Sequence, residues 1–433
     1  MSVIVDITTL THGGDGLGRL DGKAIFVSGA IPGDQVRCQL TVEKKRYAKG
    51  RLLEVVTPSP NRVEPPCQHF AECGGCDWQQ LSYADQCEWK ERLFRENCHH
   101  QLDVDPAVVK PLVQSPQQMG YRSRVQFKCS VRADTFLLGF YRRASHSVVD
   151  VDSCLVVDPR IESLISPLRQ LFDGSSYARQ VIQIDVAVGD VGPSRIVVHF
   201  QGSKLNPFVQ WLQQNAGHID ASLFVRDDRS EQVQHVRGEE GVSVEVGTPA
   251  VALTYGVGGF AQINLRQNRH LVEMVLRAVQ LSDDDTVLDL YCGMGNFSLP
   301  LARHANHVIG VEGYAPSIAS AEKNAVAAGC DNVTFHSCRV ERFMESMSQE
   351  VDVVVLDPPR AGAKDALVAL LTLTPRSIVY VSCDQQTLLR DLTVLIAGGY
   401  QIESIQPIDM FPQTAHTEAL AVLRRVTSRD CDI

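Results

Sequence analysis

The feature that most constrains the fold is a regular alternation of short apolar runs and helical stretches over residues 256–433. The apolar runs at 286–290, 307–311, 351–356 and 377–381 predict strands buried on both faces. Strands separated by helices form a parallel sheet, and ligands bind beyond the carboxyl ends of such strands. This part of the chain is therefore expected to be a Rossmann-like α/β domain with its site residues at the strand ends.

The run V-L-D-L-Y-C-G-M-G-N-F predicts a nucleotide-binding turn after the first of these strands. Gly293 and Gly295 allow the backbone to pass close to a ligand, and Glu312, at the end of the next strand, can accept ribose hydroxyls. A dinucleotide would require a third glycine where the chain has Ser298, and Asp289 would repel a pyrophosphate. The same carboxylate suits the cationic methionine end of S-adenosylmethionine. We therefore expect that cofactor, with a dinucleotide or a purely structural turn as the alternatives.

Three further residues are predicted at the same sheet edge. L-D-P-P-R-A-G places Asp357 on a stiff loop, I-V-Y-V-S-C-D ends in Cys383, and H-T-E-A delivers Glu418 from a loop that leads into a final strand at 419–423. A lone cysteine is more often a core residue, but this one precedes a helix whose N-terminus favours the thiolate.

Cys383 and Glu418 together fit one reaction, the methylation of carbon-5 of uracil. A thiolate that adds to carbon-6 activates carbon-5 for attack on a methyl sulfonium, and a base then removes the carbon-5 proton. The target base must be flipped out of its stack or be single-stranded.

A compact group of cysteines, C-x5-C-x2-C, lies at Cys67, Cys73 and Cys76, with two glycines that allow the loop to fold around a metal. The chain has 13 cysteines in all, and a disulfide framework is not expected in a large protein of a reducing compartment. Four thiolates bind either zinc or a 4Fe–4S cluster, and the spacing leaves both possible.

The first 255 residues divide into two predicted regions. Residues 1–58 show strand-like alternation broken by glycine turns, which predicts a small β-barrel, and a proline-rich linker follows. Residues 59–255 read as mixed, with strands at 181–188 and 195–200 and a helix around 83–97. Residues 160–250 carry no chemical motif.

Charge and hydropathy limit the partners. The net charge of −10 excludes a protein that coats nucleic acid over its whole surface. Basic residues mixed with aromatics at 44–51 and 121–143 predict local RNA contacts, although either patch could be an ordinary solvated face. The chain has no long apolar run and no secretory leader, so we expect a cytoplasmic protein with no membrane partner.

The motifs together resemble those of the RNA uracil-5-methyltransferase family. The matching elements are F-A-Q-I-N at 260–264, D-L-Y-C-G-M-G-N-F, G-V-E-G, L-D-P-P-R-A-G, V-S-C-D and H-T-E-A. The N-terminal H-G-G-D-G-L-G-R resembles a TRAM domain, an OB-like RNA-binding barrel. The resemblance implies a multidomain α/β protein: a TRAM barrel at 1–58, a central α+β domain with an iron–sulfur site at 59–255, and an S-adenosylmethionine-dependent methyltransferase domain at 256–433.

The resemblance also assigns roles to individual residues. It implies that Cys383 is the nucleophile and Glu418 the proton acceptor. The positions matching the cofactor pocket are Gln262, Tyr291, Gly293, Asn296, Glu312 and Asp357. It adds Cys154 as a fourth ligand to Cys67, Cys73 and Cys76, and it favours a 4Fe–4S cluster with a structural or RNA-positioning role.

The expected substrate is a uridine of 23S ribosomal RNA, with no obligate protein partner. This follows from the resemblance to the ribosomal branch of the family, since the tRNA-modifying members are taken to lack both the barrel and the cysteine cluster. Two alternatives remain: the same chemistry on tRNA, and a non-enzymatic iron–sulfur RNA-binding assembly factor.

Overall fold

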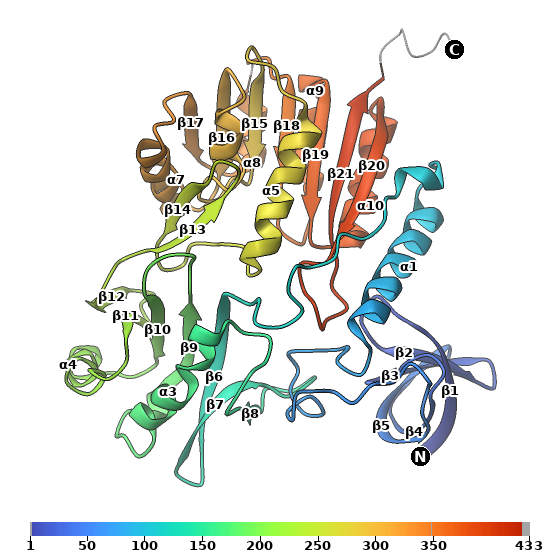
Figure 1. Cartoon of the computed structure of the whole chain (residues 1–433), viewed down its shortest axis with the longest axis vertical. Helices are drawn as coiled ribbons and strands as arrows, with labels where there is room; N and C mark the ends of the chain where they lie inside the picture. The colour runs from blue at the N-terminus through green and yellow to red at the C-terminus, as the bar shows by residue number, and fades with distance from the viewer. Residues whose placement is uncertain (1, 348, 427–433) are drawn as a thin grey trace.

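The N-terminal barrel is present in the computed structural model, which describes residues 2–347 and 349–426 (Figure 1). Five strands close in the order β1-β2-β3-β5-β4. Alternate side chains such as Val5, Ile25 and Val36 fill its interior, as the period of a strand requires. The strands are β1 (Ser2–Leu10), β2 (Gly16–Leu20), β3 (Lys23–Ser28), β4 (Gln35–Glu43) and β5 (Tyr47–Thr57).

A long loop follows the barrel and leads into helix α1 (Tyr83–Gln101), which begins where the Ser82 hydroxyl accepts the Asp85 N–H. The short helix η1 (Pro106–Val108) comes next. Phe94 and Cys98 of α1 pack into the core of the C-terminal sheet, and α1 lies beside that sheet in Figure 1. The predicted helix is therefore confirmed, and it is longer than expected.

The central sheet has seven strands in the order β12-β11-β10-β9-β6-β7-β8. Its strands are β6 (Arg124–Arg132), β7 (Thr135–Tyr141), β8 (Val148–Asp150), β9 (Val181–Ala187), β10 (Ser194–Phe200), β11 (Ala221–Asp227) and β12 (Val233–Arg237). The helices between them are α2 (Pro159–Glu162), α3 (Ile165–Phe172), η2 (Ala178–Gln180) and α4 (Leu205–Asn215). Both strands predicted in this region are present, and α3 and α4 share one apolar core with the sheet.

A separate hairpin, β13 (Val242–Val246) and β14 (Val251–Tyr255), connects this part to the C-terminal sheet. Its apolar side chains share a core with helix α5 (Leu265–Val279) and strand β15 (Thr286–Leu290). Helix α1 and this hairpin thus pack with the C-terminal sheet, although the limits 59–255 assign them to the central region. The limits 1–58, 59–255 and 256–433 stay predictions.

The C-terminal sheet has seven strands in the order β17-β16-β15-β18-β19-β21-β20, of which the first five are parallel (Figure 1). The expected Rossmann-like domain is thereby confirmed. The remaining strands are β16 (His307–Glu312), β17 (Val333–Ser337), β18 (Val353–Leu356), β19 (Ser377–Ser382), β20 (Tyr400–Ile408) and β21 (Glu418–Arg425). The remaining helices are α6 (Ser298–Ala302), α7 (Ala315–Ala328), α8 (Val340–Ser346), α9 (Lys364–Leu373) and α10 (Gln385–Ala397).

Two boundaries in this sheet differ from expectation. Strand β18 begins at Val353 rather than at 351, and Glu418 is the first residue of β21 rather than part of the preceding loop. Over residues 2–347 and 349–426, no helix has the length and apolarity to cross a membrane.

Candidate active site and thiol cavity

The pairing of β19 with β21 brings Cys383 and Glu418 together. The two strands are antiparallel, with Ser382 opposite Ala419, so the next pair outward consists of Cys383 and Glu418. Glu418 is buried, with 1% of its surface exposed, whereas Cys383 is partly exposed at the strand end. A thiol and a carboxylate that lie 35 residues apart in the sequence (418 − 383) therefore share one sheet edge.

Cys383 is mainly a protonated thiol at neutral pH. Burial raises the pKa of Cys383 to about 11, and the negative charges of Glu418 and Asp357 act in the same direction. Helix α10 begins two residues later, but its N-terminus is capped by Asp384, whose carboxylate accepts the Thr387 N–H at 2.9 Å. Burial and the two acids therefore raise the pKa of this thiol, and the expected effect of the helix end stays a prediction.

Asp357 lies next to this pair, at the end of β18. The Gln262 amide Nε2 donates to Asp357 Oδ2 at 3.4 Å. Burial raises the pKa of Asp357 to about 7, and burial together with the charge of Asp357 raises the pKa of Glu418 well above its usual value. The site therefore holds two carboxyl groups whose pKa values are raised by burial, and such groups are stronger bases than exposed carboxylates.

Arg360 is a site residue that the sequence reasoning did not single out. Its positive charge lowers the pKa of both Cys383 and Glu418, against the larger effect of their burial. The signal was available, because Arg360 directly follows the two prolines of the loop that carries Asp357.

The glycine turn after β15 has the backbone that a ligand-binding turn requires. Gly293 and Gly295 have φ of +56° and +93°, and Tyr291 also lies in the left-handed region at +63°. A Cβ at Gly293 would meet no atom within 4 Å, so the backbone there faces open space. The chain can approach a ligand closely at this point.

Asp289 supplies negative charge beneath this turn. It is fully buried, and the Ser298 hydroxyl donates to its Oδ2 at 2.5 Å. Its Oδ1 has no hydrogen-bond partner within the described part of the chain. Burial raises the pKa of Asp289 to about 7. An orphaned buried carboxylate oxygen fits a cationic ligand group, as the methionine end of S-adenosylmethionine would provide.

Tyr291 and Glu312 line a cavity of about 810 Å³ between the ends of β15 and β16. Glu312 Oε1 accepts the Tyr314 N–H at 2.7 Å, which orients the carboxylate. Asn296 is held differently, through two amide hydrogen bonds of 2.8 and 3.2 Å with Asn268. Of the predicted cofactor residues, Tyr291 and Glu312 thus line this cavity together, and most of its other lining comes from α8 and α9.

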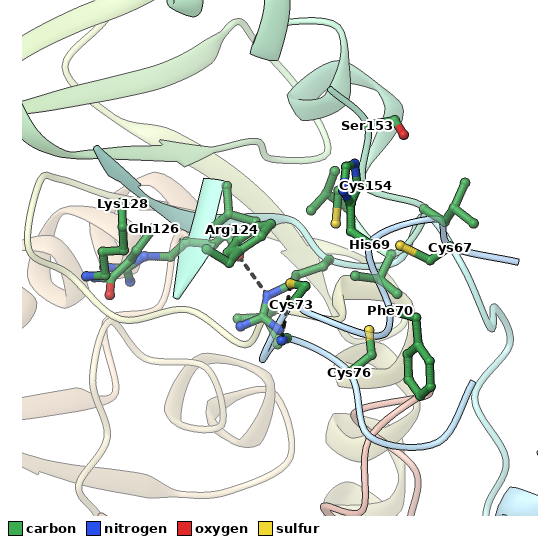
Figure 2. A pocket seen from close by; sticks show the side chains of 18 of the residues that line it. Cys67, His69, Phe70, Cys73, Cys76, Arg124, Gln126, Lys128, Ser153 and Cys154 are labelled. Carbon is green, nitrogen blue, oxygen red and sulfur yellow. Dashed lines mark hydrogen bonds between the residues drawn. The ribbon is translucent and has the colours of Figure 1, made fainter. Parts of the chain in front are cut away.

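The four predicted cysteine ligands line a second cavity of about 400 Å³, which we call the thiol cavity. Figure 2 shows the sulfur atoms of Cys67, Cys73, Cys76 and Cys154 facing the same space from two separate stretches of chain. Gly74 docks the cysteine loop against β7, since its N–H donates to the Tyr141 carbonyl at 3.0 Å. A Cβ at this glycine would lie 2.9 Å from that oxygen, so the close approach requires glycine.

The thiols are not arranged around a single ion. Among residues 2–347 and 349–426, no group of three His, Cys, Asp or Glu side chains is positioned to hold a metal ion. Burial raises the pKa of Cys76 to about 12, and the neighbouring thiolates add to that rise. The Gly75 N–H points at Cys73 Sγ, 3.4 Å away.

The thiol cavity adjoins the active site through one segment. Phe260, Ala261 and Ile263 line the cavity, while Gln262 between them reaches Asp357. The F-A-Q-I-N segment therefore forms a wall shared by the two sites, with Gln262 directed to Asp357 and its neighbours lining the thiol cavity.

An α/β sheet with a glycine turn, strand-end acids and a cysteine–glutamate pair defines the class of nucleic-acid methyltransferases that activate a base covalently. Residues 90–426 match the family model described as tRNA (uracil-5-)-methyltransferase, and residues 3–53 match the TRAM domain model. The chain belongs to this uracil-5-methyltransferase family.

Individual relatives align over nearly the whole chain. This chain is 35% identical over 421 residues to the 23S rRNA (uracil(1939)-C(5))-methyltransferase RlmD of Vibrio cholerae. The alignment covers 96% of this chain and 94% of the relative. The RlmD of Pectobacterium atrosepticum is 33% identical over 425 residues, covering 97% and 93%. Both alignments include the barrel and the cysteine loop.

A solved structure also covers the molecule. The tRNA (uracil-54, C5)-methyltransferase of Pyrococcus abyssi, in complex with S-adenosyl-L-homocysteine, has a TM-score of 0.77 at 25% identity, and the match spans 98% of this chain and all of that one. A tRNA enzyme therefore matches the full architecture, barrel included. The expectation that the tRNA-modifying members lack this barrel is wrong as a general rule.

Proposed function

We propose that the protein methylates carbon-5 of a uridine in 23S ribosomal RNA, with S-adenosylmethionine as the methyl donor. The observation that carries the proposal is the register that brings Cys383 beside Glu418 at the end of β19, next to the Gln262–Asp357 pair. The two RlmD relatives, aligned over more than nine-tenths of the chain, support 23S ribosomal RNA as the substrate. The ribosome as target implies action in the cytoplasm.

In this reaction, Cys383 acts first. Its thiol proton passes to water, and the sulfur then forms a bond to carbon-6 of the uracil. The electron pair of the 5,6 double bond moves toward the carbonyl and makes carbon-5 nucleophilic. S-adenosylmethionine, when bound, supplies an electrophilic methyl group to carbon-5. Glu418 then removes the carbon-5 proton, the double bond re-forms, and the Cys383 thiolate leaves.

Other residues hold the reactants. Glu312 would accept the ribose hydroxyls of the donor in the cavity that it lines with Tyr291. The Gly293 turn and Asn296 would complete the pocket, and the buried carboxylate of Asp289 would favour the positive charge of the donor. Gln262 can read the uracil edge, because its amide lies at the boundary between Asp357 and the thiol cavity.

We further propose that Cys67, Cys73, Cys76 and Cys154 hold a 4Fe–4S cluster. The proposal is supported by four cysteine side chains that line one cavity, which is the number and type of ligand that a four-iron cluster requires. The N–H of Gly75 toward Cys73 Sγ is the kind of hydrogen bond that stabilises a ligand sulfur. The cluster would fix the F-A-Q-I-N wall, because methyl transfer needs no electrons.

The proposed function is tested by measuring methyl transfer to deproteinised 23S ribosomal RNA and to tRNA in parallel. We expect 5-methyluridine at one position of the ribosomal RNA. Transfer to tRNA alone would favour the tRNA reaction, for which the match to the Pyrococcus abyssi enzyme is the supporting observation. If the protein binds the RNA but transfers no methyl group to it, the alternative of a non-enzymatic assembly factor would be favoured.

A further inference from the structure

The loop 409–417, which joins β20 to β21 and ends directly before Glu418, is polar but buried. Asp409, Gln413 and Thr414 have exposed fractions of 0%, 3% and 7%. In Figure 1 the chain between β20 and β21 extends away from the sheet toward the segment that precedes α1. A buried polar loop needs partners for its hydrogen-bonding groups, and here the partners come from other parts of the molecule.

The first partner is the segment that follows the third cysteine. The N–H groups of Asp77 and Trp78 both donate to the Gln413 carbonyl, at 2.8 and 3.1 Å. In return, Asp77 Oδ2 accepts the Ala415 N–H at 3.4 Å. Gln413 itself has a φ of +69°, a conformation that a non-glycine residue keeps only where its surroundings hold it. The peptide after Cys76 is therefore docked on the loop within five residues of Glu418.

The second partner is Gln86 of α1, which is 1% exposed and holds both segments at once. Its Nε2 donates to the Trp78 carbonyl at 3.0 Å and to Gln413 Oε1 at 2.9 Å. Its Oε1 accepts the Gln413 N–H at 3.0 Å. Nearby, the Lys90 ammonium donates to Asp409 Oδ1 at 2.6 Å in a fully buried ion pair.

Cys383 and Glu418 are attached to different segments. Cys383 directly follows β19 and leads into α10. Glu418 is the first residue of β21, where it pairs with Ile408 of β20, and it continues directly from the loop that contacts Asp77 and Gln86. A change in those contacts therefore acts on the segment that leads into Glu418.

We propose that Asp77 and Gln86 are positioning residues for Glu418, and that they set the rate of proton removal from carbon-5 without controlling the addition of Cys383 to carbon-6. The inference rests on the proposed function. A shift of about 1 Å in a reacting group can cost about 100-fold in rate, so removing either side chain should slow the proton step by roughly 10- to 100-fold.

The test uses the full-length protein, S-adenosylmethionine and RNA with ordinary uridine. For Asp77→Ala and Gln86→Met we expect covalent protein–RNA complex to accumulate on denaturing gels while methylated product forms roughly 10- to 100-fold more slowly. Asp77→Asn should restore turnover, because its amide oxygen can still accept the Ala415 N–H. The matched control is Asp285→Ala, which removes a buried carboxylate at the amino end of β15, where it accepts from Arg376 at 2.5 Å.

Two outcomes would overturn the proposal. One is a parallel fall of complex and product in Asp77→Ala and Gln86→Met, as in a general loss of structure, and the other is complex accumulation in the Asp285→Ala control as well. RNA containing 5-fluorouridine separates this inference from the function it rests on, because fluorine cannot leave carbon-5 as a proton does. If the wild-type protein forms no adduct with that RNA, the proposed function itself is refuted. If the wild type and all variants form the adduct, the addition of Cys383 is intact, and slow turnover on ordinary uridine places the defect at the proton step.

Discussion

The molecule has two cysteine sites, separated by the F-A-Q-I-N wall, and their surroundings differ. Cys383 is a single thiol at a sheet edge, beside Glu418 and close to Asp357. The thiol cavity gathers four cysteines among apolar side chains and the basic side chains Arg122, Arg124 and Lys128, with no carboxyl group in its lining.

The difference shows which surroundings make a cysteine a nucleophile and which make it a metal ligand. A thiol beside a carboxylate can add to a base and be released again, because the carboxylate can remove the proton from carbon-5. Four thiols around one cavity, with cationic side chains and no carboxylate in its lining, are suited to hold a metal group as thiolates. If this difference is functional, substitutions at Cys383 should affect methyl transfer, and substitutions in the thiol cavity should affect the bound metal group.

The largest effect is expected from Cys383→Ala. Removing the nucleophile should lower methyl transfer to RNA by at least about 10⁴-fold, as measured by methyl incorporation from S-adenosylmethionine. Cys330→Ala, at a partly buried thiol that lines neither site, is the matched control and should keep the wild-type rate. Retention of a tenth of the activity in Cys383→Ala would place the nucleophile elsewhere.

The next effect is expected from Glu418→Gln, which keeps the shape of the side chain and removes its basicity. Turnover should fall by about 10²- to 10⁴-fold, while covalent protein–RNA complex accumulates because the thiolate cannot leave. The readout is the ratio of complex to methylated product. A variant that loses both equally would mean that Glu418 acts before the adduct forms.

A smaller effect is expected from pH. Because the pKa of Cys383 is raised to about 11, the thiolate is the minor form at neutral pH, and its fraction rises about tenfold for each pH unit until the pKa is reached. The rate of adduct formation with 5-fluorouridine RNA should therefore rise about tenfold per unit between pH 7 and 9. A flat profile would mean that bound RNA or donor lowers the pKa of this thiol.

The smallest effect on the methyl-transfer reaction is expected from Cys76→Ser, although this substitution should abolish iron binding. We expect iron and sulfide to be lost and the RNA affinity to fall by about tenfold, or ~1.4 kcal/mol, while the Cys383 adduct still forms at saturating RNA. Elemental analysis and an RNA titration measure the two quantities. Zinc in place of iron in the wild-type protein would contradict the cluster.

The strand-end residues were predictable from the sequence because each strand of a parallel sheet can be recognised from its own short apolar run. Glu312, Asp357 and Cys383 each come at the end of an apolar run, and the carboxyl ends of such runs meet at one edge. The small barrel was predictable for a similar reason, since glycine turns between short alternating strands are short-range signals.

The remaining features depend on contacts between distant parts of the chain. Gln86 and Gln413 lie 327 residues apart, and neither position has a local pattern that indicates the contact. Helix α1 was predicted as a helix, but its place in the core of the C-terminal sheet could not be, because that depends on how the whole chain folds. The raised pKa of Cys383 could not be predicted from the sequence, because it arises from burial and from two acids that are distant in the chain.

The central claim is that Cys383 bonds to the target uracil, and peptide mapping of the trapped complex tests it most directly. Wild-type protein is incubated with S-adenosylmethionine and 5-fluorouridine RNA, then digested, and the modified peptide is located by mass spectrometry. The account predicts a methylated fluorouracil nucleotide on the peptide that contains Cys383. The same mass on a peptide from the thiol cavity, or on any other cysteine, would contradict it.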